Sequence, residues 1–284
     1  MTTAVVIPAF NGLPFLQSNL PAVLALKAGE VIVVDDASTD GTGEFIRNSY
    51  QRIRLLTNSS NRGFPKSVNT GFNSASADVI ILLNQDVRPD KNLLSAVLPL
   101  FADPKVFAVS FNEGNYGRAK VDFTAGFLQY SSRKSKITDI SFWASGGSAA
   151  FRKSVWDKLG GFDTVFTPGY HEDLDIGWRA RKNGYQILWC PDAKVDHARE
   201  TAFNTAFSKG HLQRIKDRNY LICQWKNLDC GNLMTHLSAV FRRCLKSPGY
   251  FIPVFMAKLH WPEIIYYRLS HRHLLPDSVV FKHV

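Results

Sequence analysis

Cysteine is scarce in this sequence, and the few cysteines follow no pattern. They are Cys190, Cys223, Cys230 and Cys244, with no C-x-x-C pair and no regular spacing among them. This excludes a zinc knuckle and a disulfide framework. The chain needs neither, because 284 residues with 45% hydrophobic content can bury a full core. We therefore expect a protein that resides in a reducing compartment.

Long apolar runs are also lacking. No stretch reaches the ~18 uninterrupted apolar residues that a membrane-spanning helix requires. Residues 1–8 have neither the basic region nor the cleavage-site pattern of a secretory signal. These two absences predict a protein that stays in the cytoplasm and does not cross a bilayer.

Acidic residues are few in the last third of the chain. Residues 201–284 hold twelve Lys and Arg against four Asp and Glu, so most of the net charge of +10 lies there. Such a segment could meet anionic lipid, nucleic acid or an acidic substrate, and charge alone does not choose among them.

Strand-like and helix-like patterns alternate in the first part of the chain. Short β-branched runs at 5–7, 31–34, 53–57 and 79–83 are separated by helical spacing over 13–27, 42–50 and 64–76. This alternation predicts an α/β fold with a mainly parallel sheet covered by helices on both faces.

The later part of the chain is less regular. Residues 111–141 show weak periodicity, and we expect a long loop over the active-site face. Order returns over 146–196, and helical patterns follow. We predict a catalytic domain over residues 1–225 and a helical, basic and aromatic extension over 226–284.

Polar residues follow the predicted strands directly. In parallel sheets a ligand binds beyond the carboxyl ends of the strands, which is where Asn11, Asp35, Asp36 and the Asn84-Gln85-Asp86 tripeptide stand. Adjacent carboxylates such as Asp35 and Asp36 are unfavourable unless they bind something, and a base or ribose is a suitable partner. A turn in which Ser38 and Asp40 cap the next helix is the alternative.

Two residues are candidates for a metal site. Asp86 follows a predicted central strand, and Mg²⁺ sites commonly combine one or two carboxylates with substrate phosphates. His197 follows the predicted strand 186–195 and could add a nitrogen ligand, while Asn84 could offer a neutral oxygen. An ordinary turn and a structural histidine are the alternatives.

The HEDLD sequence at 171–175 opens a segment with helical spacing. Carboxylates at a helix start usually cap it, which is the simple explanation for Glu172 and Asp175. We assign a different role to Asp173, because an aspartate beside a sugar's anomeric carbon could take the proton from an attacking hydroxyl.

Taken in order, these blocks resemble glycosyltransferase family 2, which has the GT-A fold, and within it the bacterial rhamnosyltransferase-like members. The resemblance covers about residues 4–225. The matching blocks are VIPAFN (6–11), VVDDASTDGT (33–42), NRGF (61–64), NTG (69–71), LLNQD (82–86), GGSAAFR (146–152), LGGFD (159–163), EDLD (172–175), GWRA (177–180), PDA (191–193) and His197.

The resemblance implies a role for each site residue. Asp86 and His197 would bind a divalent metal, Mg²⁺ or Mn²⁺, and Asp173 would be the general base. Residues 146–148, with Gly147 at their centre, would line the floor between donor and acceptor, and Asn84 would face the ribose. The residues implied to contact or lie near the nucleoside are Pro8, Phe10, Asn11, Asp35, Asp36, Asn61 and Lys66.

The reaction implied is inverting transfer of a sugar from a nucleoside diphosphate to a hydroxyl of a saccharide or lipid-linked saccharide, in cell-surface polysaccharide or glycolipid assembly. The subgroup suggests dTDP-rhamnose as donor, with UDP-hexoses second. Asn84 departs from the family's usual aspartate, which predicts modest metal affinity. Gln85 has no assigned role.

Two other functions fit the sequence less well. A sugar nucleotidyltransferase would need a Gly-rich, Arg-containing phosphate loop, and residues 8–12 contain one glycine and no basic residue. A protein that binds specific nucleic acid would show a helix-turn-helix, zinc or RNA-recognition signature, which is missing.

The basic and aromatic stretch 241–275 is open to two interpretations. It could lie on the anionic inner face of the plasma membrane, near a lipid-linked acceptor, which would make the protein peripheral there. Alternatively it packs on the catalytic domain or forms a homodimer contact.

Overall fold

The computed structural model describes residues 1–114, 116–198, 208–271 and 275–282. Within them, nine strands form one sheet, whose main path runs β3-β2-β1-β4-β10-β6-β11-β5 with β9 beside β11. The strands are β1 (Thr3–Ala9), β2 (Glu30–Asp35), β3 (Arg54–Thr57), β4 (Val79–Leu83), β5 (Val87–Pro89), β6 (Val106–Asn112), β9 (Asp139–Ile140), β10 (Ser148–Arg152) and β11 (Gln186–His197).

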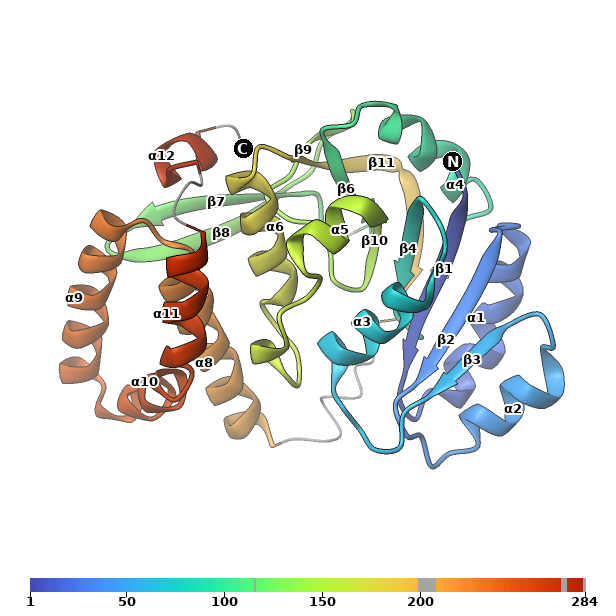
Figure 1. Cartoon of the computed structure of the whole chain (residues 1–284), viewed down its shortest axis with the longest axis horizontal. Helices are drawn as coiled ribbons and strands as arrows, with labels where there is room; N and C mark the ends of the chain where they lie inside the picture. Colours follow the sequence, from blue (N-terminus) through green and yellow to red (C-terminus); the bar gives the residue numbers. More distant parts are fainter. Residues whose placement is uncertain (115, 199–207, 272–274, 283–284) are drawn as a thin grey trace.

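Helices cover this sheet and continue beyond it (Figure 1). Those beside the sheet are α1 (Leu13–Ala25), α2 (Thr42–Ser49), α3 (Phe64–Ser74), α4 (Leu93–Val97), α5 (Lys153–Leu159) and α6 (Glu172–Lys182). The C-terminal ones are α8 (Lys209–Asn227), α9 (Cys230–Lys246), α10 (Phe251–Lys258), α11 (Trp261–Ser270) and α12 (Asp277–Val280).

The first four strands of the sheet are parallel, and both faces are buried. β1 pairs in parallel with β2 and β4, and β2 pairs in parallel with β3. Successive side chains of a strand point to opposite faces, so Val5 joins a core with Leu16 of α1, while Val6 joins a core with Phe72 of α3. The predicted α/β fold with a mainly parallel, helix-covered sheet is confirmed.

The second half of the sheet is mixed. β10 lies antiparallel between β4 and β6, and β11 then pairs in parallel with β6. Ser148 of β10 is in register with Leu83, the last residue of β4. This pairing brings Gly146 and Gly147, which precede β10, to the end of β4 where Asn84 begins.

The prediction of a long loop over residues 111–141 was wrong. Most of this segment forms a hairpin of β7 (Arg118–Thr124) and β8 (Phe127–Arg133), joined at Ala125 and Gly126, which both have positive φ. One face of the hairpin packs its apolar residues against the C-terminal helices, as Leu128 does in a core shared with Leu221 and Val240. The other face is largely exposed, so polar and apolar residues alternate along β7, a local pattern that the sequence analysis missed.

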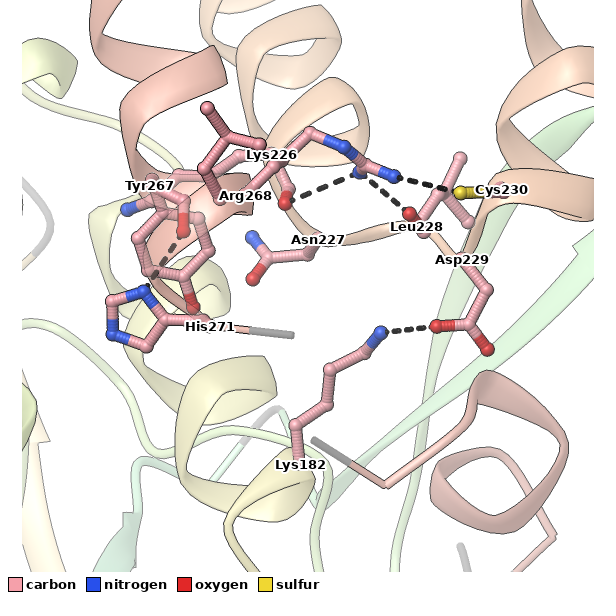
Figure 2. A pocket seen from close by; sticks show the side chains of 10 residues that line it. Lys182, Lys226, Asn227, Leu228, Asp229, Cys230, Tyr267, Arg268 and His271 are labelled. Carbon is pink, nitrogen blue, oxygen red and sulfur yellow. Dashed lines mark hydrogen bonds and ion pairs between the residues drawn. The ribbon is translucent and has the colours of Figure 1, made fainter. Parts of the chain in front are cut away.

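The C-terminal helices are attached by buried ion pairs. Lys226 of α8 lies 2.6 Å from Asp163 and 3.0 Å from Asp175 of α6. Lys182, also on α6, lies 2.7 Å from Asp229 (Figure 2) and 3.2 Å from Asp277. The proposed domain boundary at residue 225 falls inside α8, two residues before its end. Among the described residues, no helix has the length and apolar character needed to span a bilayer.

Candidate active site

The loops that follow β1 and β2 are joined by hydrogen bonds. Asp36 donates its backbone N–H to the carbonyl of Ala9 over 2.8 Å. The Asn11 side-chain oxygen accepts from the Thr39 N–H at 2.8 Å, and the Asn11 N–H donates to the Ser38 hydroxyl at 2.9 Å. Asn11 itself has a positive φ of 48°, which asparagine tolerates better than most residues. The structure thus places Asn11 and Asp36 together at one edge of the sheet.

Asp35 and Asp36 are both buried and both hold neighbouring main chain. Asp35 accepts from the Ser38 N–H at 2.9 Å, and Asp36 accepts from the N–H groups of Arg62 and Gly63, each at 2.9 Å. The turn alternative raised for this loop is therefore present for Asp40, whereas the Ser38 hydroxyl accepts from Asn11 and does not cap α2. One Asp40 oxygen accepts from the N–H of Thr42 at the start of α2, and the other accepts from the N–H of Leu13 at the start of α1.

The other predicted nucleoside residues differ in their exposure. Pro8 is buried within β1, Phe10 is half-buried, Lys66 is half-buried on α3, and Asn61 is exposed. The Asn61 side chain accepts from the Gly63 N–H at 3.0 Å. Pro8 has little exposed surface to offer a ligand, whereas Phe10, Asn61 and Lys66 have more.

Gln85, which had no predicted role, is tied to Phe10. Its side-chain oxygen accepts from the Phe10 N–H at 2.9 Å, and its amide nitrogen donates to the Phe10 carbonyl at 3.3 Å. A Cβ on Gly12 would come within 2.0 Å of this amide, so any larger residue at position 12 would force the Gln85 side chain to move. Gln85 fixes the conformation of the loop after β1.

The predicted metal residues come together. The antiparallel pairing of β5 with β11 puts His197 opposite Val87, next to Asp86. His197 Nε2 lies 3.4 Å from Asp86 Oδ1. Asp86 Oδ2 and Asn84 Oδ1 are buried and have no hydrogen-bond partner among the described residues. A Cβ on Gly147 would lie 2.6 Å from the Asn84 amide nitrogen and 3.5 Å from the His197 ring.

Glu113 is a further member of this cluster that the sequence analysis missed. Its Oε2 lies 3.1 Å from His197 Nδ1, and its Oε1 accepts from the hydroxyls of Ser145 and Ser148. Burial opposes the charge of Glu113, but these contacts with His197 and Ser148 lower the pKa of Glu113. Glu113 follows β6 by one residue, so the rule that found Asp86 after β4 would also have found it.

The donor atoms of this cluster fit a divalent cation. Oxygen ligands suit Mg²⁺ and Mn²⁺, and imidazole is accepted by the transition metals. Two of the oxygens, Asp86 Oδ2 and Asn84 Oδ1, are buried without a partner of their own among the described residues. Within the same residues, no set of three or more His, Cys, Asp or Glu is arranged to hold an ion by itself. The cluster fits a site in which substrate phosphates supply further ligands.

Asp173 stands in the first turn of α6. Its Oδ2 accepts from the N–H of Gly146 at 3.2 Å, and its Oδ1 accepts from the N–H of Leu174 at 2.8 Å. Burial raises the pKa of Asp173. Burial and the charge of Asp173 raise the pKa of the neighbouring Glu172 well above its usual range. An aspartate with a raised pKa is a better general base than an ordinary surface carboxylate.

Asp175 is not the helix cap that its position suggested. It is fully buried and forms ion pairs with Arg179 at 2.7 Å and with Lys226 at 3.0 Å. It also accepts a hydrogen bond from the Asn227 amide. Asp175 therefore joins α6 to α8 and supports the helix on which Asp173 stands.

Asp173 and His197 line the same cavity, which has a volume of about 470 Å³. We call it the catalytic cavity after the role predicted for Asp173, and it lies between the ends of the sheet strands and the β7–β8 hairpin. Its lining residues are Ser110, Phe111, Glu113, Tyr116, Gly117, Ala119, Tyr130, Ser131, Ser132, Ser141, Trp143, Ser145, Asp173 and His197. The structure therefore places the proposed base, Asp173, and a proposed metal ligand, His197, in the wall of one cavity. The predicted nucleoside residues lie outside that wall.

Two known proteins are similar in sequence to part of this chain. A pre-mycofactocin glycosyltransferase of Mycobacterium tuberculosis is 30% identical over 206 residues, which are 69% of this chain and 43% of that protein. A poly-beta-1,6-N-acetyl-D-glucosamine synthase of Staphylococcus aureus is 27% identical over 196 residues, which are 64% of this chain and 46% of that protein. The chain thus spans less than half the length of these relatives.

Solved structures share the fold. GalNAc-T7, crystallised with UDP, GalNAc and Mn²⁺, has a TM-score of 0.65 at 19% identity, over 80% of this chain and 48% of that one. A mannosyltransferase of Pyrobaculum calidifontis in complex with GDP-Man and Mn²⁺ has a TM-score of 0.57 at 20% identity, over 98% and 84%. The family model described as "Glycosyl transferase family 2" matches residues 4–160, which are more than half of the sequence. With the carboxylates and histidine placed as described, this match shows that the chain belongs to glycosyltransferase family 2.

Proposed function

We propose that this protein transfers a sugar from a nucleoside diphosphate to an acceptor hydroxyl, with inversion at the anomeric carbon. The observation that carries this proposal is that Asp173 and His197 line one cavity of about 470 Å³, whose lining also includes Glu113. A cavity of this size is typical of small-molecule sites. Its lining combines a base of raised pKa with the side of a cluster suited to a divalent cation.

Asp173 is the proposed general base. As the acceptor oxygen forms its bond to the anomeric carbon, the hydroxyl proton passes to the Asp173 carboxylate, and the bond from that carbon to the diphosphate oxygen breaks. The Gly146 N–H donates a hydrogen bond to the Asp173 carboxylate and thereby orients it. General bases of this kind contribute about 10²–10⁴-fold to a rate.

Asp86 and His197 are the proposed metal ligands, and the buried side-chain oxygen of Asn84, which has no hydrogen-bond partner in the described part of the chain, is a further candidate. When bound, a divalent cation offsets the negative charge that grows on the leaving diphosphate. The Mn²⁺ present with UDP or GDP-Man in two structurally similar proteins supports Mg²⁺ or Mn²⁺ in this role.

The proposed nucleoside site consists of Phe10, Asn11, Asp35, Asp36, Asn61 and Lys66 over the buried Pro8. The donor we favour is dTDP-rhamnose, from the resemblance of the motifs to rhamnosyltransferase-like sequences, and a UDP-hexose comes second. Either pyrimidine could pair its imide N–H with a carboxylate oxygen of Asp35 or Asp36.

We further propose that the C-terminal helices contact an anionic membrane, where a lipid-linked saccharide would be presented. Exposed apolar side chains recur at helical spacing on α9, at Met234, Phe241 and Leu245, and on α10, at Phe251 and Phe255, followed by Leu259 just after α10. Residues 231–271 carry five Lys or Arg against Glu263 alone. Apolar faces with basic flanks suit the surface of anionic lipid.

Vesicle co-sedimentation tests the membrane contact. Vesicles of phosphatidylglycerol should retain the wild type, and the double variant Phe255→Ser and Leu259→Ser should lose most of this binding. Phosphatidylcholine vesicles are the control for charge. Equal retention of wild type and variant would exclude the membrane contact, and a shift from dimer to monomer in the variant would instead favour a contact between copies of the chain.

A donor screen tests the catalytic proposal. Wild type and Asp173→Asn are incubated with dTDP-rhamnose or UDP-hexoses, in Mn²⁺ or EDTA, while thermal stabilisation and nucleotide release are followed. We expect one donor to stabilise both proteins in Mn²⁺ only, and nucleotide release to fall about 10²-fold or more in the variant. If no donor stabilises the wild type, the assignment of a nucleotide-sugar donor fails.

A further inference from the structure

A second cavity adjoins the catalytic cavity. It has a volume of about 450 Å³ and lies between the β7–β8 hairpin, α8 and the residue before α6. We call it the hairpin cavity. Its lining residues are Phe127, Leu128, Gln129, Tyr130, His171, Gln213, Lys216, Asp217, Tyr220 and Arg243. Tyr130 lines both cavities, so they share this side chain as a common wall.

Tyr130 is held in place from both sides. Its ring meets Trp143, which lines the catalytic cavity, edge to face at 5.8 Å, and meets His171, which lines the hairpin cavity, at 6.4 Å. The side chain is nevertheless 53% exposed. An aromatic ring fixed by such contacts and open to solvent can contact ligands in either cavity.

The hairpin cavity is close to Asp173 along the chain and in space. His171 precedes Asp173 by two residues, and burial together with the charge of Asp173 raises the pKa of the Tyr130 hydroxyl. A molecule in the hairpin cavity therefore lies just across Tyr130 from the proposed base. This arrangement suits a ligand longer than one sugar ring.

The polar groups of the hairpin cavity fit hydroxyl groups. His171 Nδ1 is buried and has no hydrogen-bond partner among the described residues. Gln213 donates its amide to Asp217 at 3.0 Å and leaves its exposed oxygen as an acceptor. Lys216 sits 4.3 Å above the Tyr170 ring and keeps its ammonium donors. Donors and acceptors beside aromatic rings provide what a sugar ring needs, namely partners for its hydroxyls and a surface for its C–H face.

We propose that the hairpin cavity binds the second sugar ring of an oligosaccharide acceptor whose first ring presents its hydroxyl to Asp173. This inference rests on the proposed glycosyltransferase function and specifies its acceptor as at least a disaccharide. Each cavity lies within the ~300–1,000 Å³ range of small-molecule sites, and a monosaccharide acceptor would leave the second one without use.

The variant that tests this is Gln213→Ala with Lys216→Ala. Gln213 is exposed and Lys216 is half-buried, the two lie about one turn apart on α8, and alanine favours a helix. Neither residue contacts the catalytic cavity. Arg214→Ala is the matched control, because Arg214 is exposed on the same helix but does not line the hairpin cavity.

The probes are p-nitrophenyl monosaccharides and disaccharides of glucose, N-acetylglucosamine and rhamnose. Dissociation constants are measured by ligand-observed NMR, and donor hydrolysis is followed separately. We expect at least one disaccharide to bind ten-fold or more tightly than its monosaccharide. The double variant should abolish this preference and keep the monosaccharide affinity and donor hydrolysis, and the Arg214 variant should behave as wild type.

Three results would overturn the proposal: no disaccharide preference, no binding of any glycoside, or a preference that survives in the double variant. Donor hydrolysis separates this outcome from failure of the proposed function. Hydrolysis without a disaccharide preference would leave the transferase standing and remove only the second subsite. A disaccharide preference without binding or hydrolysis of any nucleotide sugar would remove the transferase and leave a saccharide-binding cavity.

Discussion

His197 turns its Nδ1 toward Glu113, whose Oε2 is 3.1 Å away, and thereby turns its Nε2 toward Asp86. A carboxylate beside one ring nitrogen fixes the orientation of the imidazole and the nitrogen left for a metal. Glu113 is in turn held by the hydroxyls of Ser145 and Ser148. The proposed metal site therefore depends on a residue outside its predicted ligands.

Glu113→Gln should weaken the metal site without unfolding the protein. The amide keeps the size of the side chain but removes the charge that orients His197, and such changes typically cost about 10–100-fold in metal affinity or activity. Mn²⁺-dependent thermal stabilisation and donor hydrolysis measure the effect. Glu30→Gln, which removes a partly exposed ion pair with Arg54, serves as control. Unchanged Mn²⁺ dependence in Glu113→Gln would remove Glu113 from the site.

Gly147→Ala should disturb Asn84 specifically. The added Cβ would lie 2.6 Å from the Asn84 amide nitrogen, a distance that forces the amide to move. We expect donor hydrolysis to fall at least ten-fold while the melting temperature changes by only a few degrees. Gly231→Ala is the control, because its Cβ would meet nothing within 4 Å on α9. Equal activity of the two variants would show that the space beside Asn84 is not needed.

Gln85→Ala should loosen the loop that follows β1. The variant loses both hydrogen bonds to the Phe10 main chain. The Phe10 N–H and carbonyl then stay partly buried without these partners, which costs about 1–3 kcal/mol of unfolding free energy. We also expect a higher KM for the donor, because Phe10 and Asn11 belong to the proposed nucleoside site. Urea denaturation and donor kinetics measure the two effects. A stability loss with an unchanged KM would assign Gln85 a structural role only.

Asp175→Asn should be strongly destabilising. Asp175 is fully buried between Arg179 and Lys226, and its removal leaves two buried cations short of a partner. Breaking a buried ion pair from one side typically costs about 3–5 kcal/mol. Chemical denaturation should show a loss of this size. Asp157→Asn, which breaks an exposed pair with Lys153, should change the unfolding free energy by less than ~1 kcal/mol.

The stability of the fold should decrease with acidification through His236. Burial lowers the pKa of His236 to about 4, although its hydrogen bond to the Gly126 carbonyl opposes the shift. The unfolded chain takes up this proton near pH 6.5, so the contribution is complete above pH 6.5 and is lost as pH falls toward 4. At ~1.4 kcal/mol per pKa unit, the loss reaches about 3 kcal/mol.

Urea denaturation between pH 7.5 and 4.5 tests this dependence. His236→Gln retains a donor for the Gly126 carbonyl but does not titrate, so the difference in unfolding free energy between wild type and variant should shrink as pH falls. His211→Gln, at an exposed position on α8, is the matched control. A difference that stays constant with pH for His236→Gln would exclude a buried neutral histidine.

Local pattern was enough to predict the first half of the fold. β-Branched runs and helical spacing are read over a few residues, and each predicted strand from 5–7 to 79–83 lies within or beside an observed one. The hairpin was missed although β7 alternates polar and apolar residues, because β8 becomes uniformly polar over residues 131–133. Only the tertiary structure shows that helices about a hundred residues later in the chain cover Leu128.

The same division holds for the site. The sequence by itself determined the residue types and their local places, with Asp86 just after β4, His197 at the end of β11 and Asp173 in the first turn of α6. Ligands bind beyond the carboxyl ends of parallel strands, which is where the proposed chemistry needs such groups. Only the tertiary structure decided that Glu113 orients His197, that Gln85 holds the loop at Phe10, and that a second cavity opens across Tyr130. These relationships depend on pairings between strands and helices distant in sequence, and their geometry exists only once the sheet has formed.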